Sequence, residues 1–269
     1  MTAVPGTPEA GSILAQLEAY RERSRTLFRL KFIAVWVVLI GALLGALWAT
    51  GNIDLSFIAE WGPFILGGAG LTILLSVVSI IFATMLAILG AIGRLSRNAY
   101  INGVASLYVS LVRGTPLIVQ IFFIYFGLPQ LGIVLPSIPA GIIALSFNYG
   151  AYMTEIFRAG IQAVPLGQRE AAQSLGMPER QVMGRIVLPQ AFRIVIPAIG
   201  NDFVAMIKDS ALVSTIAVQE LLWRAGQVGT QNFRSLEALL IAAAVYWILT
   251  IVFSAFQERL EKRMARGDR

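Results

Sequence analysis

Uncharged stretches of the chain alternate with short charged segments, and several of these stretches are long enough to cross a membrane. Runs of 22, 33, 41 and 20 residues without Asp, Glu, Lys or Arg occupy residues 32–53, 61–93, 114–154 and 238–257. A membrane-spanning helix needs about 20 predominantly apolar residues. The pattern therefore predicts a bundle of helices that spans a membrane.

The longest run has room for parts of two helices, and Pro129, Pro136 and Pro139 in its middle indicate a turn between them. A shorter apolar segment, residues 192–208, is interrupted by polar residues and predicts a helix shielded by its neighbours. The sequence thus predicts an all-α integral membrane helical bundle. Its transmembrane helices, about six in number, are expected at residues 32–51, 64–92, 104–128, 138–160, 191–208 and 237–257.

Composition agrees with a membrane protein and excludes several kinds of enzyme. Apolar residues make up 57% of the chain and charged residues 13%, about half the charged share of a typical soluble domain. The chain has no Cys and no His, which excludes disulfides, thiol nucleophiles, Ser-His-Asp hydrolysis and the usual zinc sites. It also lacks the Gly-x-x-x-x-Gly-Lys-Ser/Thr motif of P-loop nucleotide-binding proteins.

The basic residues predict the orientation in the membrane. In the six-helix arrangement, 17 of the 21 basic residues fall on one side, in the two terminal tails, the turn after the second helix and the segment after the fourth. Cytoplasmic segments of membrane proteins are enriched in Lys and Arg. We therefore expect both termini in the cytoplasm, and the net charge of +6 reflects topology rather than nucleic-acid binding.

The two ends of the chain extend beyond the predicted core of the bundle. Residues 1–30 are expected to form a cytoplasmic tail, and residues 31–60 an extra N-terminal transmembrane helix with a periplasmic loop. Its apolar run is longer than that of a cleaved signal peptide, so we expect the helix to be retained. Residues 259–269 form a basic cytoplasmic tail.

Residues 161–190 form the most informative segment. Gln168 to Leu175 predicts a short helix, with Gly176 as its C-terminal cap and Pro178 at the first position of the next helix. Ala171 and Ala172 give the short helix a low profile that lets another backbone approach. From the residues alone, a docking surface and a plain surface hairpin both remain open.

Several spaced motifs resemble the permease subunits of bacterial ABC importers, in the branch that carries polar amino acids. The EAA signature of that family is matched by Glu170-Ala171-Ala172, Gly176, Ile186, Leu188 and Pro189. The likeness covers residues 64–258 and includes further matches: Arg113–Leu117, Phe122–Pro129, Tyr152, Glu155, Arg158, Gly167-Gln168, Leu188–Ala191, Arg193, Pro197, Asn201 and Lys208. The chain departs from the family pattern at Lys208–Leu212, where Lys-Asp-Ser-Ala-Leu replaces the more usual Lys-Asp-Thr-Ser-Leu.

The resemblance implies a type I ABC-importer permease core at residues 64–258, with residues 161–190 as the coupling segment. Glu170, Ala171, Ala172 and Gly176 would dock in a cleft of a separate ATP-binding subunit. ATP and Mg²⁺ would be bound by that subunit, and this chain would bind no cofactor and catalyse no reaction. Further implied partners are a periplasmic or extracellular substrate-binding protein and a second permease subunit, in a homodimer or heterodimer within the bacterial inner membrane.

Five polar residues are candidates for the substrate path. Tyr152, Glu155 and Arg158 are three residues apart on one helix, and Asn201 and Lys208 share a face of another. For Glu155 and Arg158, an ion pair near the cytoplasmic interface is the simpler interpretation. For Asn201 and Lys208, a polar path and hydrogen bonds between helices are equally open, and we expect Asp202 to pair within the bundle.

A break at Arg113–Pro116 divides the third predicted helix. Pro116 removes a backbone hydrogen bond and disfavours a straight helix. The break indicates either a bent gate helix or a kink at the membrane interface.

Taken together, the chain is predicted to be the permease subunit of an ATP-driven importer of polar amino acids or related compounds. The alternative is a self-contained secondary transporter or channel for small polar solutes. Such proteins show inverted repeats and paired broken helices, and no convincing repeat occurs here. An intramembrane enzyme is disfavoured because His, Cys and a clustered carboxylate pair are all missing.

Overall fold

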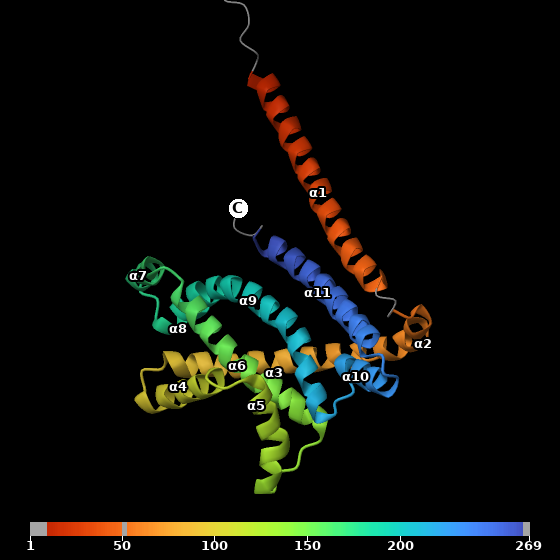
Figure 1. Cartoon of the computed structure of the whole chain (residues 1–269). Coiled ribbons are helices and arrows are strands. Elements are labelled where there is room, and N and C mark those ends of the chain that lie inside the picture. The colour runs from red at the N-terminus through yellow and green to blue at the C-terminus, as the bar shows by residue number, and fades with distance from the viewer. Residues whose placement is uncertain (1–9, 50–52, 266–269) are drawn as a thin grey trace, which may run out of the picture. The chain divides into compact units, whose positions relative to one another are not determined.

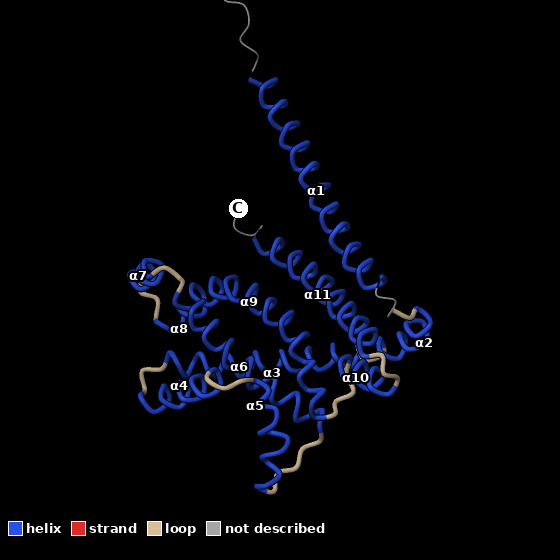
Figure 2. The backbone as a smooth tube through the Cα atoms, viewed as in Figure 1, coloured by secondary structure: helices blue, strands red, loops and turns tan. Residues whose placement is uncertain are grey.

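The computed structural model describes residues 10–49 and 53–265 and divides into two compact units, Met1–Leu55 and Ser56–Arg269. Across these described ranges the chain is mostly helical and contains no β-strand (Figure 2). In the first unit, one helix, α1 (Ala10–Ala49), runs for 40 residues. The rest of the chain forms ten further α-helices and four short 3₁₀ or π segments within the described residues.

The α-helices of this bundle follow one another through short connections (Figure 1). They are α2 (Leu55–Leu66), α3 (Ala69–Leu95), α4 (Ala99–Arg113), α5 (Leu117–Phe122), α6 (Ser137–Gln162), α7 (Leu166–Ser174), α8 (Glu179–Val182), α9 (Leu188–Asp209), α10 (Leu221–Gln231) and α11 (Ser235–Ala265). The four other segments are the π-helices η1 (Phe123–Gly127) and η3 (Met183–Val187) and the 3₁₀-helices η2 (Leu128–Leu131) and η4 (Ser210–Ile216).

Four helical stretches in the described residues are long and apolar enough to cross a membrane, and a fifth is added if the bent α4–α5 pair counts as one span. The four are Ala19–Ala49, Leu55–Leu95, Glu179–Ile216 and Ser235–Met264. Helix α6 is not among them, although its 26 residues cover about 39 Å at 1.5 Å per residue. Half of its residues are buried, so its polar side chains are shielded by neighbouring helices. The predicted all-α membrane bundle is confirmed.

The helices begin earlier than predicted, and the difference is largest for the first one. The first helix begins at Ala10 instead of residue 32, because good helix formers continue upstream without a Pro or a further Gly after Gly11. The break predicted at Arg113–Pro116 within the third helix is present, and α4 and the segment after it meet at 106°. Pro116 explains the break, since it lacks an N–H and restricts Thr115 before it to an extended backbone.

The centre of the bundle is the crossing of α3 and α6, where glycines let the two helices approach closely. A Cβ atom on Gly90 would overlap the side chain of Thr154. Thr154 is fully buried, and its hydroxyl donates a 2.8 Å hydrogen bond to the Gly150 carbonyl, so it cannot move aside cheaply. A Cβ on Gly150 would in turn lie 2.9 Å from Cβ of Leu86 and 2.7 Å from the Tyr108 hydroxyl.

Replacing Gly90 with alanine is therefore expected to destabilise the bundle by about 1 kcal/mol, because the overlap outweighs the gain in helix propensity. Gly103 in α4 is the matched control, since a Cβ there meets no atom within 4 Å. Gly103→Ala should stabilise the protein by about 0.5–1 kcal/mol. Thermal unfolding in detergent measures both changes, and shifts of equal sign would contradict the tight crossing.

The second packing centre joins α2, α10 and α11 around a buried carboxylate. Glu220 caps the N-terminus of α10 by accepting a 2.9 Å hydrogen bond from the Trp223 backbone N–H. Its other oxygen accepts hydrogen bonds from the hydroxyls of Tyr246 and Thr72. Burial raises the pKa of the Glu220 carboxyl, although these hydrogen bonds act in the opposite direction. Close approach at this junction requires Gly68, whose Cβ would lie 2.7 Å from Cα of Leu221.

Candidate functional site

A helix–turn–helix connects α6 to α9, as the sequence predicts. It consists of α7, a four-residue turn and α8, which continues through the π-helical segment η3 into α9. Pro165 is the N-cap residue of α7. Pro178 is the N-cap of α8 and precedes its first helical residue, whereas we expected it at that first position.

The turn after α7 is a Schellman motif, with Gly176 in the left-handed conformation at φ +78°. The Gly176 N–H donates to the Gln173 carbonyl at 2.9 Å, and the Met177 N–H donates to the Ala172 carbonyl at 3.2 Å. The predicted capping role of Gly176 is confirmed. Its φ lies in a region that L-residues with a Cβ rarely adopt, which accounts for a glycine here.

The helix–turn–helix of α7 and α8, the α7–α8 hairpin, has a small core of its own. It consists of five buried residues: Val164, Ala172, Val182, Val187 and Ala191. Two polar contacts also hold α7 in place. Arg169 donates to the Ile161 carbonyl at 2.9 Å, and the Gln173 amide donates to the Glu179 carboxylate at 2.9 Å. The hairpin is therefore held as a firm projection at the junction of α6 and α9.

The two alanines of the EAA signature lie in different surroundings. Ala172 is buried in the hairpin core, whereas Ala171, Glu170 and Gly176 are exposed. Leu175 lies on the exposed side with 83% of its side chain accessible. The outer face of α7 thus combines a small residue, a carboxylate and an unpaired apolar side chain, a combination suited to contact with another protein.

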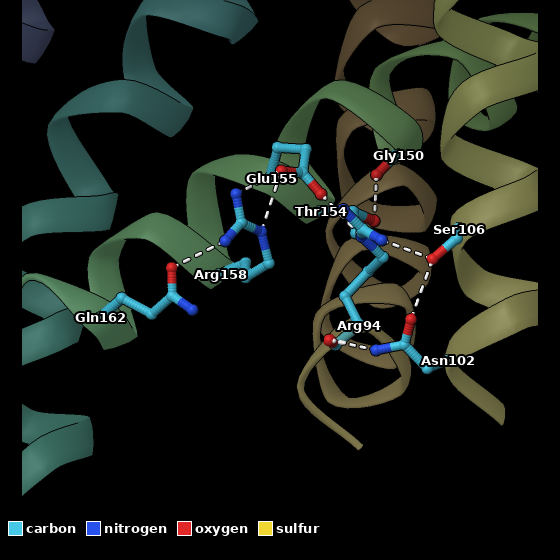
Figure 3. Close-up of polar contacts among 8 residues, drawn as sticks. All are labelled: Arg94, Asn102, Ser106, Gly150, Thr154, Glu155, Arg158 and Gln162. Atoms are coloured by element: carbon cyan, nitrogen blue, oxygen red, sulfur yellow. Dashed lines mark hydrogen bonds and ion pairs between the residues drawn. The ribbon is translucent and has the colours of Figure 1, made fainter. Parts of the chain in front are cut away.

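Glu155 lies between two arginines from different parts of the chain (Figure 3). Its Oε1 accepts a 3.0 Å contact from Arg94 Nε at the end of α3, and its Oε2 accepts a 2.7 Å contact from Arg158. Arg158 also donates to the Gln162 amide oxygen at 2.7 Å. The predicted pair of Glu155 and Arg158 is present, and Arg94 is a partner that the sequence did not reveal.

Arg94 extends this network to α4. Its guanidinium donates to the Ser106 hydroxyl, its backbone carbonyl accepts a 2.7 Å bond from the Asn102 amide, and Ser106 donates to Asn102 at 3.0 Å (Figure 3). Every oxygen of Glu155 has a positively charged partner. The carboxylate therefore joins α3 to α6 directly, and it is linked to α4 through Arg94 and Ser106.

The other three path candidates lie in separate surroundings. Tyr152 is partly exposed, and the Arg113 guanidinium lies 5.1 Å from the centre of its ring, a cation–π contact. Asn201 accepts a 2.9 Å hydrogen bond from Gln257 of α11. Lys208 is exposed and lines a cavity of about 420 Å³ with residues of α10 and α11.

A pair of carboxylates on α9 was not among the predicted path residues. Asp209 accepts a 2.7 Å hydrogen bond from the Tyr149 hydroxyl of α6. Asp202 lies on the same helix, and its buried Oδ2 has no hydrogen-bond partner among the described residues. The expected pairing of Asp202 is thus absent for that oxygen. The seven-residue spacing of the two carboxylates, which is two helical turns, is the signal that could have identified them.

Among the described residues, no group of three or more acidic side chains is arranged to hold a metal ion.

The chain matches the family described as binding-protein-dependent transport system inner membrane component over residues 83–266. It is 42% identical over 205 residues to the L-cystine transport system permease protein TcyB of Bacillus subtilis (strain 168), covering 76% of this chain and 88% of that protein. It is 38% identical over 218 residues to the arginine transport system permease protein ArtQ of the same organism, covering 81% of this chain and 100% of the relative.

Among solved structures, the chain resembles a protein described as an amino acid ABC transporter with histidines. The TM-score is 0.76 at 38% sequence identity, over 79% of this chain and 99% of the other. The likeness therefore covers nearly all of that chain and leaves about a fifth of this chain outside it.

Proposed function

Because the chain belongs to the family of binding-protein-dependent transport system inner membrane components, we propose that it carries polar amino acids across the inner membrane as the permease subunit of an ATP-driven importer. Its homologues are transport components rather than enzymes. The proposed substrate class is supported by relatives whose names specify cystine and arginine.

The observation that carries this proposal is the firm α7–α8 hairpin with an exposed outer face. It projects between α6 and α9, so force applied to it reaches both helices directly. The sequence carries no P-loop motif, so the energy source is a separate ATP-binding subunit that holds ATP and Mg²⁺. Glu170, Ala171 and Gly176 are the proposed contacts with that subunit, and Ala172 supports them from the hairpin core.

Two further partners belong to this proposal. A substrate-binding protein delivers the amino acid on the outer side, and a second permease subunit completes the path. Both termini and the hairpin lie on the cytoplasmic side, in keeping with the excess of Lys and Arg there. Closure of two ATP-binding subunits would move the two hairpins together, and α6 and α9 would transmit the motion and switch access from outside to inside.

The direct test is uptake by vesicles that contain this chain together with its ATP-binding and second permease subunits. Radiolabelled cystine, arginine and glutamine should accumulate only when ATP is inside and the substrate-binding protein outside. Without ATP, uptake should fall to the level of empty vesicles. ATP-independent uptake by this chain alone would overturn the proposal in favour of a secondary transporter.

For the substrate path, we propose that Asp202 and Asp209 receive the ammonium end of an amino acid. The buried Oδ2 of Asp202 has no hydrogen-bond partner among the described residues, and an unpaired buried oxygen is costly unless a ligand satisfies it. Arg113 beside Tyr152 supplies the opposite charge for a carboxylate. Tyr152, Asn201 and Lys208 remain lining candidates, whereas Glu155 and Arg158 serve to hold the helices together.

In the same vesicles, Asp202→Asn should raise the KM for uptake about tenfold, because one charge-assisted hydrogen bond is lost. Glu258→Gln is the control, since Glu258 is exposed and pairs with the exposed Lys262. An unchanged KM for Asp202→Asn would exclude Asp202 from the path.

A further inference from the structure

Phe233, in the connection between α10 and α11, has an unusual combination of backbone and side-chain features. Its φ is +56°, in the left-handed region, and 96% of its side chain is exposed. An aromatic residue rarely adopts this backbone, and a large exposed apolar ring gains little from its own chain. Neither feature is explained by the fold.

The turn itself shows which residue the backbone favours. The Arg234 N–H donates to the Gly229 carbonyl at 2.9 Å, and the Asn232 N–H donates to the Val228 carbonyl at 3.1 Å. Phe233 thus occupies the C′ position of a Schellman motif, where glycine is the usual residue. In the same chain, the equivalent position after α7 is Gly176. Phe233 therefore occupies a position where the backbone favours glycine.

The exposed surface beside Phe233 is rich in uncharged polar side chains. Gln227, Thr230 and Gln231 are exposed on α10 and line a hollow of about 430 Å³ together with Trp223. The charged residue of this helix, Arg224, is turned toward α2, where it donates to the Phe64 carbonyl at 3.0 Å. A helix face against lipid tails would be apolar, and one against lipid headgroups would be basic. The exposed face of α10 presents two uncharged amides and a hydroxyl beside Leu222 and Trp223.

Helix α10 and the α7–α8 hairpin lie at opposite ends of α9 (Figure 1). The 22 residues of α9 separate them by about 33 Å, roughly the thickness of the hydrocarbon core. With the hairpin in the cytoplasm, as the proposed function requires, Phe233 faces the outer side of the membrane.

We propose that Phe233 is an anchor residue for the substrate-binding protein, and that its ring inserts into an apolar recess of that protein while Gln227, Thr230 and Gln231 form the polar rim. An aromatic side chain surrounded by uncharged polar groups is the usual composition of an interface hot spot. The proposal rests on the proposed function, because it requires the partner and the orientation given there.

The test uses the assembled transporter in nanodiscs and two variants that separate the ring from the backbone. Phe233→Ala removes the ring and keeps a Cβ at positive φ, whereas Phe233→Gly removes the ring and suits the turn. Both should raise the concentration of substrate-binding protein that half-maximally stimulates ATP hydrolysis, about tenfold, and leave basal hydrolysis unchanged. The melting temperature of Phe233→Gly should also be at least as high as that of the wild type.

Tyr100→Ala is the matched control, since Tyr100 is 87% exposed and lies in the first turn of α4, on the side proposed to be cytoplasmic. It should leave the half-maximal concentration unchanged. The proposal would be overturned if the half-maximal concentration of substrate-binding protein were unchanged in both Phe233 variants. It would also be overturned if Tyr100→Ala raised this concentration as much as they do. A change only in lipid dependence would assign the ring to the membrane and overturn it too. Failure of any binding protein to stimulate the wild type would instead refute the proposed function.

Discussion

Ala171→Arg is expected to lower ATP-driven uptake at least a hundredfold while leaving the permease folded. Ala171 is exposed on the outer face of α7, so the larger side chain has room in the isolated chain. In the assembled transporter it would separate the hairpin from the ATP-binding subunit, and a charge placed in a closely packed interface costs about 3 kcal/mol or more, which is a factor of about a hundred. Uptake into vesicles and co-purification with the ATP-binding subunit measure the effect.

Two control variants make this result specific. Ala99→Arg introduces the same side chain at another exposed alanine, in the first turn of α4, and should leave uptake within about twofold. Ala172→Arg should instead unfold the hairpin, because Ala172 is buried among Val164, Val182 and Val187. Normal uptake by Ala171→Arg would remove the coupling role from this face of α7.

The second large effect is expected on stability, from Glu155→Ala. The carboxylate lies between Arg94 and Arg158 and is only 18% exposed, so its removal leaves two guanidinium groups close together without their anion. Breaking a largely buried ion pair by deleting one partner costs about 3 kcal/mol. Unfolding in detergent, followed by the loss of helical signal, should show this loss.

Glu258→Ala is the matched control for Glu155→Ala. Glu258 also pairs with a basic residue on the same helix, Lys262, but both side chains are about two-thirds exposed. Such a surface pair contributes less than about 1 kcal/mol. Combining Glu155→Ala with Arg94→Leu should restore part of the stability, since one unpaired charge is removed. Equal losses from the two single variants would contradict the joining role of Glu155.

Local features of this protein follow well from its sequence. The short helix and its cap at Gly176 were predictable because a Schellman turn depends on residues within five positions of one another. The break at Pro116 was predictable from proline chemistry, but its angle of 106° was not, because the packing of distant helices determines it. The start of α1 was missed, since apolarity locates the part inside the membrane and not the helix that continues beyond it.

Long-range features of the candidate site did not follow from the sequence. Arg94 and Glu155 are 61 positions apart, and no local pattern indicates that α3 brings one to the other. Ala172 is buried and Ala171 is exposed because Val182 and Val187 pack on the side of Ala172, and these residues come from the next helical segments. The burial of Asp202 Oδ2 without a hydrogen-bond partner likewise depends on how distant helices pack, which the sequence does not show.

The crossing of α3 and α6 also determines where the protein can deform. Because Gly90 lies against the hydrogen-bonded Thr154 and Gly150 lies against Cβ of Leu86, we expect these two helices to resist sliding and tilting and to move together. Helices can shift more easily where one of them contacts only a long, flexible side chain of the other. Gly200 of α9 is such a position, because it lies against the Gln257 side chain of α11. In the working transporter, we therefore expect the largest relative movement of neighbouring helices where α9 contacts α11.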